Sequence, residues 1–479
     1  MSMSAEDIGR IEMSLPWKRL DVGVFGLLIL SLMLYQIQHL VPQFALFHVR
    51  EVLYLYLYAR VLFFYQVRLT KPFVALLLYL SATCLVAFHT YYLAGLAVAV
   101  PGFTRFVHLS LAAPLAAVLL DKDADIRAML YLWMGVVTAG IMTVAYQMLG
   151  GEMPWLVQNY IAIRGDLVRH KSLMGEPNVG GISAALLYLL ASTIVTKATV
   201  RYFLLFASSF LVLASISKAA VVGFLFVNFV IVIEDYRATR ITGFGFPSRR
   251  LCLQTMAVLG WILMLALNPL LYQYMTVGFN SFVGNQLAVP GAVEDFGDRF
   301  VFSQYGGSIF DFNAFTNSLA AFQLTGGDLS VLSTFVNNLS AFFSYLGAVF
   351  LDLVPVMFGQ SFTRAGSAAI ELKIPNAAGP HNMYLEVFLV GGLMLTVALV
   401  VVQALTIKTL IRQRATNSGL YKVLLPLLVL ISLYMTGYPN IYEPITGTLF
   451  WLIVGISCSC YSKAQCKENE FPRSKNLLF

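Results

Sequence analysis

The sequence predicts an all-α polytopic membrane protein with about twelve transmembrane helices. The 479 residues are 59% hydrophobic and only 11% charged, whereas a soluble domain carries about 25% charged residues. The mean hydropathy is +0.77. Apolar runs of about twenty residues recur along the whole chain, and a run of that length can cross a bilayer as a helix. Together these observations predict a single integral-membrane domain over residues 1–479.

The apolar runs divide the chain into twelve expected spans, at 22–41, 49–66, 72–92, 103–120, 127–149, 179–196, 201–216, 218–234, 252–271, 383–403, 423–438 and 444–460. The positive residues predict the direction of these spans. If the N-terminus is cytoplasmic, the inner segments hold 21 of the 31 Lys and Arg, which agrees with the positive-inside rule. Both termini are then expected in the cytoplasm. The net charge of +7 is therefore mostly a topology signal, with some attraction to membrane lipids, and gives no argument for nucleic acid.

The second expected span is the weakest of the twelve because it contains Arg60 and has Arg50 at its edge. These two residues and Arg105 belong to the cations that the inner segments do not account for. Charges inside a membrane often mark a substrate path. Arg60 and Lys218 would serve such a path, so a transporter is one interpretation of the chain.

The outer segment 150–178 is unusually cationic for its side of the membrane. It includes the stretch IAIRGDLVRHKSLMGEPNVGG, with Arg164 and Arg169. Arginine can bind phosphate oxygens in a bidentate manner, and the first turn of a helix favours an anion. Pro177 suits the first position of the helix that follows. The segment therefore predicts an anion site. The alternative is that these arginines bind lipid head groups or acids of the same loop.

The large segment 272–382 is expected as an outer loop between spans nine and ten. It carries seven acidic residues and only three cations. Within it, 339–357 is apolar, but an additional span there would move the positive residues of 404–422 and of the tail to the outer side. We therefore expect short helices in this loop, with 339–357 either re-entrant or lying at the membrane interface.

The tenth expected span opens with the stretch GPHNMYLEVFLVGG, residues 379–392. Pro380 suits the first helical position and places His381 in the first turn. The positive end of the helix there disfavours imidazolium, so a neutral, proton-accepting histidine is expected. Asn382 and Glu386 are one turn apart on a neighbouring face. The stretch is typical of a catalytic base, and equally of a histidine that anchors the helix at the interface.

Several common chemistries leave no motif in this chain. The sequence contains no HExxH, no GxxxxGK[ST] and no paired CxxC, and its five cysteines lack metal-ligand spacing. No metal and no other cofactor is predicted.

The chain resembles the O-antigen polymerase and O-antigen ligase superfamily over residues 125–400. These are bacterial inner-membrane glycosyltransferases that act on undecaprenyl-diphosphate-linked glycans at the periplasmic face. The resemblance rests on about twelve spans with one large outer loop late in the chain, and on three segments: RHKSLMGEPNVGGISAALL, SISKAAVVGFLF and GPHNMYLEVFLVGGL. The second segment has Lys218 where the family usually has arginine.

The resemblance implies a metal-independent transfer of a glycosyl group. His381 would be the general base that takes the proton from the acceptor hydroxyl. Arg169 would bind the diphosphate of the donor, and Arg299 would be the second catalytic arginine, with Arg364 as its competitor. The remaining predicted substrate-binding residues are Arg164, Asn178, Lys218, Asn382 and Glu386.

The resemblance favours a polymerase that joins lipid-linked oligosaccharide units. This preference rests on the spacings Arg164–Gly175 and Arg169–Gly180 and on the enlarged loop. A ligase that transfers the glycan to lipid A-core remains an alternative, as does a flippase or other transporter. The expected partners are the undecaprenyl-diphosphate-linked donor, a glycan acceptor, membrane lipids and a chain-length regulator protein.

Overall fold

The computed structural model describes most of the first half of the chain and the last part of it. The described residues are 15–34, 46–67, 69–151, 160–162, 168–170, 173–174, 177–215, 217–242, 357, 359, 361–362, 383–415, 420–436 and 442–470. The expected span 252–271 lies outside this part, as does nearly all of the loop 272–382, including the apolar stretch 339–357 except for its last residue.

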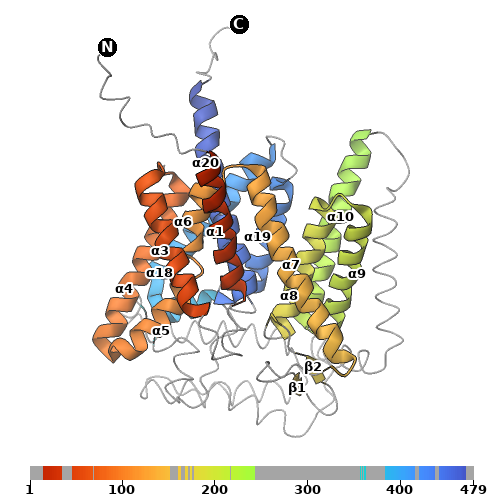
Figure 1. Cartoon of the computed structure of the whole chain (residues 1–479), viewed down its shortest axis with the longest axis horizontal. Helices are drawn as coiled ribbons and strands as arrows, with labels where there is room; N and C mark the ends of the chain where they lie inside the picture. Colours follow the sequence, from red (N-terminus) through yellow and green to blue (C-terminus); the bar gives the residue numbers. More distant parts are fainter. Residues whose placement is uncertain are drawn as a thin grey trace, which may run out of the picture.

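The described residues form a helical bundle with one short β-hairpin (Figure 1). The elements are α1 (Leu15–Met33), α3 (Leu46–Phe64), α4 (Lys71–Ala94), α5 (Leu96–Val107), α6 (Ala112–Leu119), α7 (Asp123–Met148), β1 (Tyr160–Ala162), β2 (Val168–His170), α8 (Pro177–Ile194), α9 (Ala198–Ala214), α10 (Lys218–Thr242), α18 (Met383–Ala415), α19 (Tyr421–Met435) and α20 (Pro444–Glu470). Helices make up nearly all of this regular structure, and the hairpin lies between α7 and α8 in the chain.

The helices run in both directions through the bundle, so it has two edges: α1 and α7 begin at the same edge, whereas α7 and α8 are antiparallel. Near the start of α1, Lys18 forms an ion pair of 2.6 Å with Asp121, just before α7. Tyr131, early in α7, donates to the carbonyl of Ile194 at the end of α8 (3.1 Å). We call the edge where α1 begins and α20 ends the first edge. The opposite one, where α7 ends and the hairpin lies, is the second edge (Figure 1).

Five helical segments of the described part are long and apolar enough to cross a membrane. They are Lys71–Ala94, Leu96–Leu119, Asp123–Met148, Pro177–Ile194 and Val390–Gln413. Shorter apolar helices cover Ala198–Ala214, Ala220–Ile233, Val423–Met435 and Pro444–Ser459. Length and composition therefore mark the chain as a helical membrane protein, as the sequence predicts.

Helix α8 lies in the middle of the bundle and is buried along nearly its whole length. It packs against α7, α9, α10, α19 and α20. At Gly181, a Cβ atom would come within 2.2 Å of the Ser215 hydroxyl and 2.6 Å of the Ala220 methyl group. Small residues at such a crossing allow membrane helices to approach closely, which increases their van der Waals contact.

The expected span 103–120 falls largely within the candidate span Leu96–Leu119, but a turn interrupts this segment. Helix α5 ends at Val107 and α6 begins at Ala112, with a turn between them. Two tyrosines of α3 bind carbonyls in this turn: Tyr54 donates to the carbonyl of His108, and Tyr58 donates to that of Leu111 at 2.7 Å. Side-chain donors that satisfy carbonyls in this way remove the cost of interrupting a helix inside a membrane.

The expected span 383–403 was wrong as a continuous helix, because α18 consists of two helical halves that meet at Gly392. This residue has φ 62° and ψ −159°, which is not helical. The Tyr384 hydroxyl nevertheless donates to the amide oxygen of Gln403 at 3.2 Å, although 19 positions separate them. In a continuous helix, that separation would be about 28 Å. The folded-back half (383–391) therefore doubles back along the spanning half (393–415).

Candidate functional site

The predicted site residues divide into those that the structure describes and those that it does not. Arg164, Arg299, Arg364, His381 and Asn382 lie outside the described residues. For Arg169 and Lys218 the structure describes the backbone, at the middle of β2 and at the first residue of α10. Asn178 is the second residue of α8, and Glu386 lies in the folded-back half of α18.

The hairpin places the Arg169 backbone at the second edge. Strands β1 and β2 pair antiparallel, with Ile161 opposite Arg169. Leu173, after the hairpin, donates its N–H to the Thr143 hydroxyl on α7 at 3.4 Å. Pro177 is the first residue of α8, as predicted from its missing N–H donor. Arg169 thus lies on the connection between α7 and α8, and Asn178 lies in the first turn of α8.

Glu386 has a partner that the sequence analysis did not anticipate. Its carboxylate oxygen Oε1 lies 3.4 Å from Nη2 of Arg105 on α5. The Glu386 side chain is only 2% exposed, and that of Arg105 is 25% exposed. An ion pair of this burial is retained because removal of either partner would leave the other charge in a poorly solvated place. The pair connects the folded-back half of α18 to α5.

Tyr442, in the segment just before α20, also contacts Arg105. The guanidinium of Arg105 lies 5.5 Å from the centroid of the Tyr442 ring, which is within the range of a cation–π contact. The ring of Phe106, the residue after Arg105, lies 4.1 Å from the same Tyr442 ring. Tyr442 thus contacts both Arg105 and Phe106 of α5.

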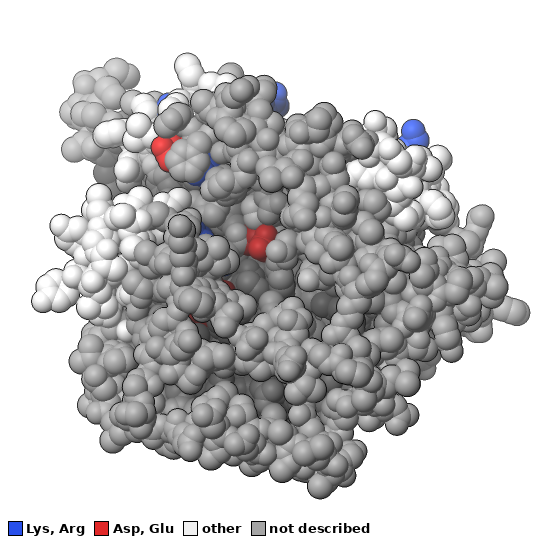
Figure 2. Space-filling model, turned by 90° about the horizontal axis from the view of Figure 1, so that it is seen from below, with Lys and Arg blue, Asp and Glu red and all other residues white. Residues whose placement is uncertain are grey.

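The start of α20, and Tyr442 with it, lies inside the bundle rather than at its second edge. The indole N–H of Trp133 donates to the carbonyl of Ile445 at 2.9 Å. Trp133 is ten residues into α7, and α7 continues to Met148, about 22 Å further along its axis. The ion pair between Arg105 and Glu386 meets Tyr442 at this depth. Figure 2 shows the second edge from below, with acidic and basic side chains of described residues near its middle.

Three described residues of the large loop, Met357, Gly359 and Ser361, lie against the break in α18, and a fourth, Phe362, packs on α4 and α5. The N–H of Ser361 donates to the carbonyl of Val390 at 3.1 Å, and the N–H of Phe362 donates to the Thr90 hydroxyl on α4 at 3.0 Å. The Phe362 ring is fully buried and lies 5.1 Å from that of Phe106. A Cβ atom on Gly392 would come within 2.6 Å of the Met357 carbonyl. The described residues of the loop thus contact α4, α5 and the break in α18.

A second buried arginine lies on α3, close to the turn between α5 and α6. Arg50 is 2% exposed and is one turn from Tyr54, the residue that binds the His108 carbonyl. Sequence reasoning counted Arg50 and Arg105 among the outer cations but gave neither a place in the site. The signal that could have found Arg105 was that it falls outside the expected inner segments, where the positive-inside rule disfavours cations.

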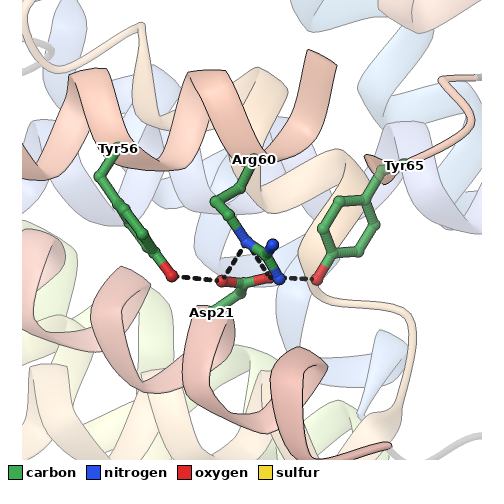
Figure 3. A network of polar contacts seen from close by, with 4 residues as sticks. All are labelled: Asp21, Tyr56, Arg60 and Tyr65. Carbon is green, nitrogen blue, oxygen red and sulfur yellow. Dashed lines mark hydrogen bonds and ion pairs between the residues drawn. The ribbon is translucent and has the colours of Figure 1, made fainter. Parts of the chain in front are cut away.

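Arg60 has a separate environment at the first edge (Figure 3). Its Nε and Nη2 atoms each lie 3.1 Å from an oxygen of Asp21, a fully buried carboxylate on α1. Tyr56 and Tyr65 donate to the same carboxylate at 3.0 and 2.8 Å. The charge of Arg60 is therefore neutralised within a local network. This arrangement explains why an arginine is tolerated in α3 and gives it no evident role at the second edge.

The fold and the site define a helical membrane protein whose polar contacts among the described residues gather around a broken helix inside the bundle. Comparison of the chain with protein-family models, with curated proteins and with solved structures gives no match.

Proposed function

We propose that the chain is a glycosyltransferase of the inner bacterial membrane that polymerises undecaprenyl-diphosphate-linked oligosaccharide units at the periplasmic face. In this proposal the second edge is periplasmic, both termini are cytoplasmic and the chain crosses the membrane twelve times. His381 is the general base and Arg169 binds the donor diphosphate, with Arg299 or Arg364 stabilising the charge of the leaving group.

The observation that carries this proposal is the anchored, folded-back half of α18. Its first described residue, Met383, is fully buried and follows His381 and Asn382 directly in the chain. The half is held by the ion pair of Glu386 with Arg105 and by the fastened loop residue Ser361. A general base contributes only when it is held within hydrogen-bond reach of the proton it abstracts. A rigid helix that starts two residues after His381 supplies such a support.

The position of the hairpin supports the proposal that Arg169 binds the donor diphosphate. Arg169 lies on the segment between α7 and α8, in the hairpin at the second edge, and Asn178 lies in the first turn of α8. A lipid-linked donor keeps its diphosphate close to the membrane surface, so residues at one edge of the bundle can reach it without crossing the hydrophobic interior. Arginine suits this task because its planar fork matches phosphate oxygens.

The test is to profile the surface glycan of a deletion strain complemented with variants. A strain without the protein should carry a single repeat unit on its core, and His381→Ala should give the same profile at normal membrane abundance. Normal chain-length ladders from His381→Ala would rule out its role as the base. Bare core with accumulated lipid-linked polymer in the deletion strain would instead indicate a ligase.

One observation favours a transporter as a second candidate. Broken helices inside membrane bundles form the substrate sites of many transporters, and α18 breaks at Gly392. A transporter should tolerate His381→Ala and lose flux with Arg60→Met and Lys218→Met. The neutralisation of Arg60 by Asp21 at the first edge speaks against a role for that arginine in a substrate path.

A further inference from the structure

We propose that Arg105 is a positioning residue: it holds the folded-back half of α18, and with it the residues that precede Met383, in the orientation that the reaction requires. This inference rests on the proposed function, because the residue positioned in this way is His381. It adds Arg105, on a helix that the sequence analysis left out of the site, to the residues that the reaction needs.

The geometry around Glu386 supports this role. Glu386 lies three positions after Met383, the first described residue of the folded-back half, and Met383 follows His381 and Asn382 directly in the chain. Its carboxylate is directed at the Arg105 guanidinium, 3.4 Å away. Movement of the folded-back half away from α5 would separate the buried Glu386 carboxylate from its partly buried partner, which is unfavourable. The ion pair therefore resists rotation or withdrawal of this half.

Contacts with Tyr442 and, through the neighbouring Phe106, with Phe362 restrict the movement of Arg105, so this residue can hold Glu386 in place. Its guanidinium lies 5.5 Å from the Tyr442 ring centroid, and the next residue, Phe106, contacts both Tyr442 and Phe362 through its ring. Lysine could supply the charge but not the planar group that both pairs with a carboxylate and stacks on a ring. The position of Arg105 thus depends on α20 and on the large loop as well as on α5.

The opposite edge offers a matched control. Arg60 also pairs with a buried carboxylate, Asp21, and its side chain is 15% exposed, compared with 25% for Arg105. Arg60→Met and Arg105→Met both remove a guanidinium and leave a buried acid behind. A loss of general stability should therefore be shared by the two variants, whereas a positioning effect belongs to Arg105 alone.

The experiment measures glycan extension by the full-length protein in liposomes, with a lipid-linked oligosaccharide as donor and acceptor. We expect Arg105→Met to lower kcat about tenfold or more, with KM for the donor within about threefold of wild type. Glu386→Gln, which keeps the shape of the side chain, should have the same effect. The exchange of Arg105→Glu with Glu386→Arg should recover part of kcat, while Arg60→Met should leave kcat unchanged per folded molecule. A wild-type kcat in Arg105→Met, or an equal loss in Arg60→Met, would overturn the proposal.

A second measurement separates this inference from the proposed function. If wild-type protein shows no glycan extension, the proposed function fails, and amide hydrogen exchange of peptides covering 383–391 then decides the role of Arg105. Faster exchange of these amides in Arg105→Met and Glu386→Gln, with unchanged exchange in Arg60→Met, supports control of the folded-back half by Arg105. Wild-type protection in both Arg105→Met and Glu386→Gln would overturn it.

Discussion

The hydroxyl of Tyr384 donates to the amide oxygen of Gln403 at 3.2 Å, although 19 positions of one element separate the two residues. This hydrogen bond is possible only because α18 reverses its direction at Gly392. The reversal carries the start of α18 into the bundle, where a continuous helix would have put it at the second edge. The folded-back half, residues 383–391, therefore lies along the spanning half within the bundle.

Substitution of Gly392 should destabilise the protein strongly. Gly392→Ala places a Cβ atom within 2.6 Å of backbone atoms of Met357 and Gly359, at a φ of 62°. Strain at positive φ alone costs about 1–3 kcal/mol, and backbone on both sides prevents relaxation. We expect the free energy of unfolding to fall by at least about 2 kcal/mol, measured by thermal unfolding in detergent.

Gly135→Ala is the control for this prediction. Gly135 lies within α7, and a Cβ atom there would meet nothing within 4 Å. Because alanine favours a helix over glycine, the substitution should be neutral or stabilise by up to about 1 kcal/mol. Equal unfolding temperatures for the two variants would show that the break at Gly392 needs no glycine.

Removal of the Thr90 hydroxyl should loosen the described end of the large loop. Thr90→Val leaves the N–H of Phe362 without the acceptor that lies 3.0 Å away. A lost neutral hydrogen bond costs about 1 kcal/mol. Hydrogen exchange of the Phe362 amide should therefore accelerate roughly fivefold to tenfold, as measured by mass spectrometry of loop peptides.

The matched variant is Thr83→Val on the same helix. Thr83 is also fully buried, but its hydroxyl donates to the carbonyl of Tyr79 within α4. The substitution should leave exchange at Phe362 unchanged. If both variants accelerate exchange equally, Thr90 acts through the stability of α4 and not through its contact with the loop.

Neutralisation of Asp21 should destabilise the first edge. Asp21→Asn removes the negative charge that compensates Arg60 and weakens the bonds from Tyr56 and Tyr65. Breaking a buried ion pair costs about 3–5 kcal/mol, and the partial exposure of Arg60 reduces this to about 2–4 kcal/mol. Denaturant or thermal unfolding measures the loss.

A more exposed pair at the same edge provides the comparison. Asp121→Asn breaks the contact with Lys18, whose side chain is 26% exposed while that of Asp121 is 38% exposed. Ion pairs of this exposure contribute at most about 1 kcal/mol. If Asp121→Asn lowers the free energy of unfolding as much as Asp21→Asn does, then burial does not determine how much these ion pairs stabilise the protein.

Lysine substitutions of the proposed diphosphate ligands should separate charge from geometry. Arg169→Lys and Arg299→Lys keep the positive charge but lose the bidentate fork. We expect each to lower glycan extension about tenfold or more. Arg127→Lys, on α7 at the first edge, should extend glycans at the wild-type rate. Wild-type activity in both Arg169→Lys and Arg299→Lys would exclude bidentate binding of the diphosphate.

The general class of the fold could be predicted from the sequence because it depends on local properties. Runs of apolar residues predict where helices can span a membrane, and the helices of the described part overlap the expected spans, although α1 and α5 begin seven residues earlier than expected. Pro177 also predicted the start of α8 correctly, since its missing N–H suits that position. The interruptions were missed. The turn before α6 and the break at Gly392 fall inside apolar runs, where hydropathy alone predicts a continuous helix.

The site could be predicted only in part for the same reason. The sequence singled out Glu386 because it lies one turn from Asn382, which is a local relationship. It could not pair Glu386 with Arg105, because these residues belong to helices far apart in the chain.

The sequence by itself determined that this protein is a helical membrane protein, how its apolar helices are spaced and where cations depart from the positive-inside pattern. Only the tertiary structure decided that α18 folds back at Gly392, that Ser361 and Phe362 fasten the loop to that break, and that Arg105 faces Glu386. Hydropathy and charge act through each residue's own preference for lipid or water. Ion pairs and helix reversals instead depend on which surfaces meet after packing, where a buried charge or carbonyl must find a partner.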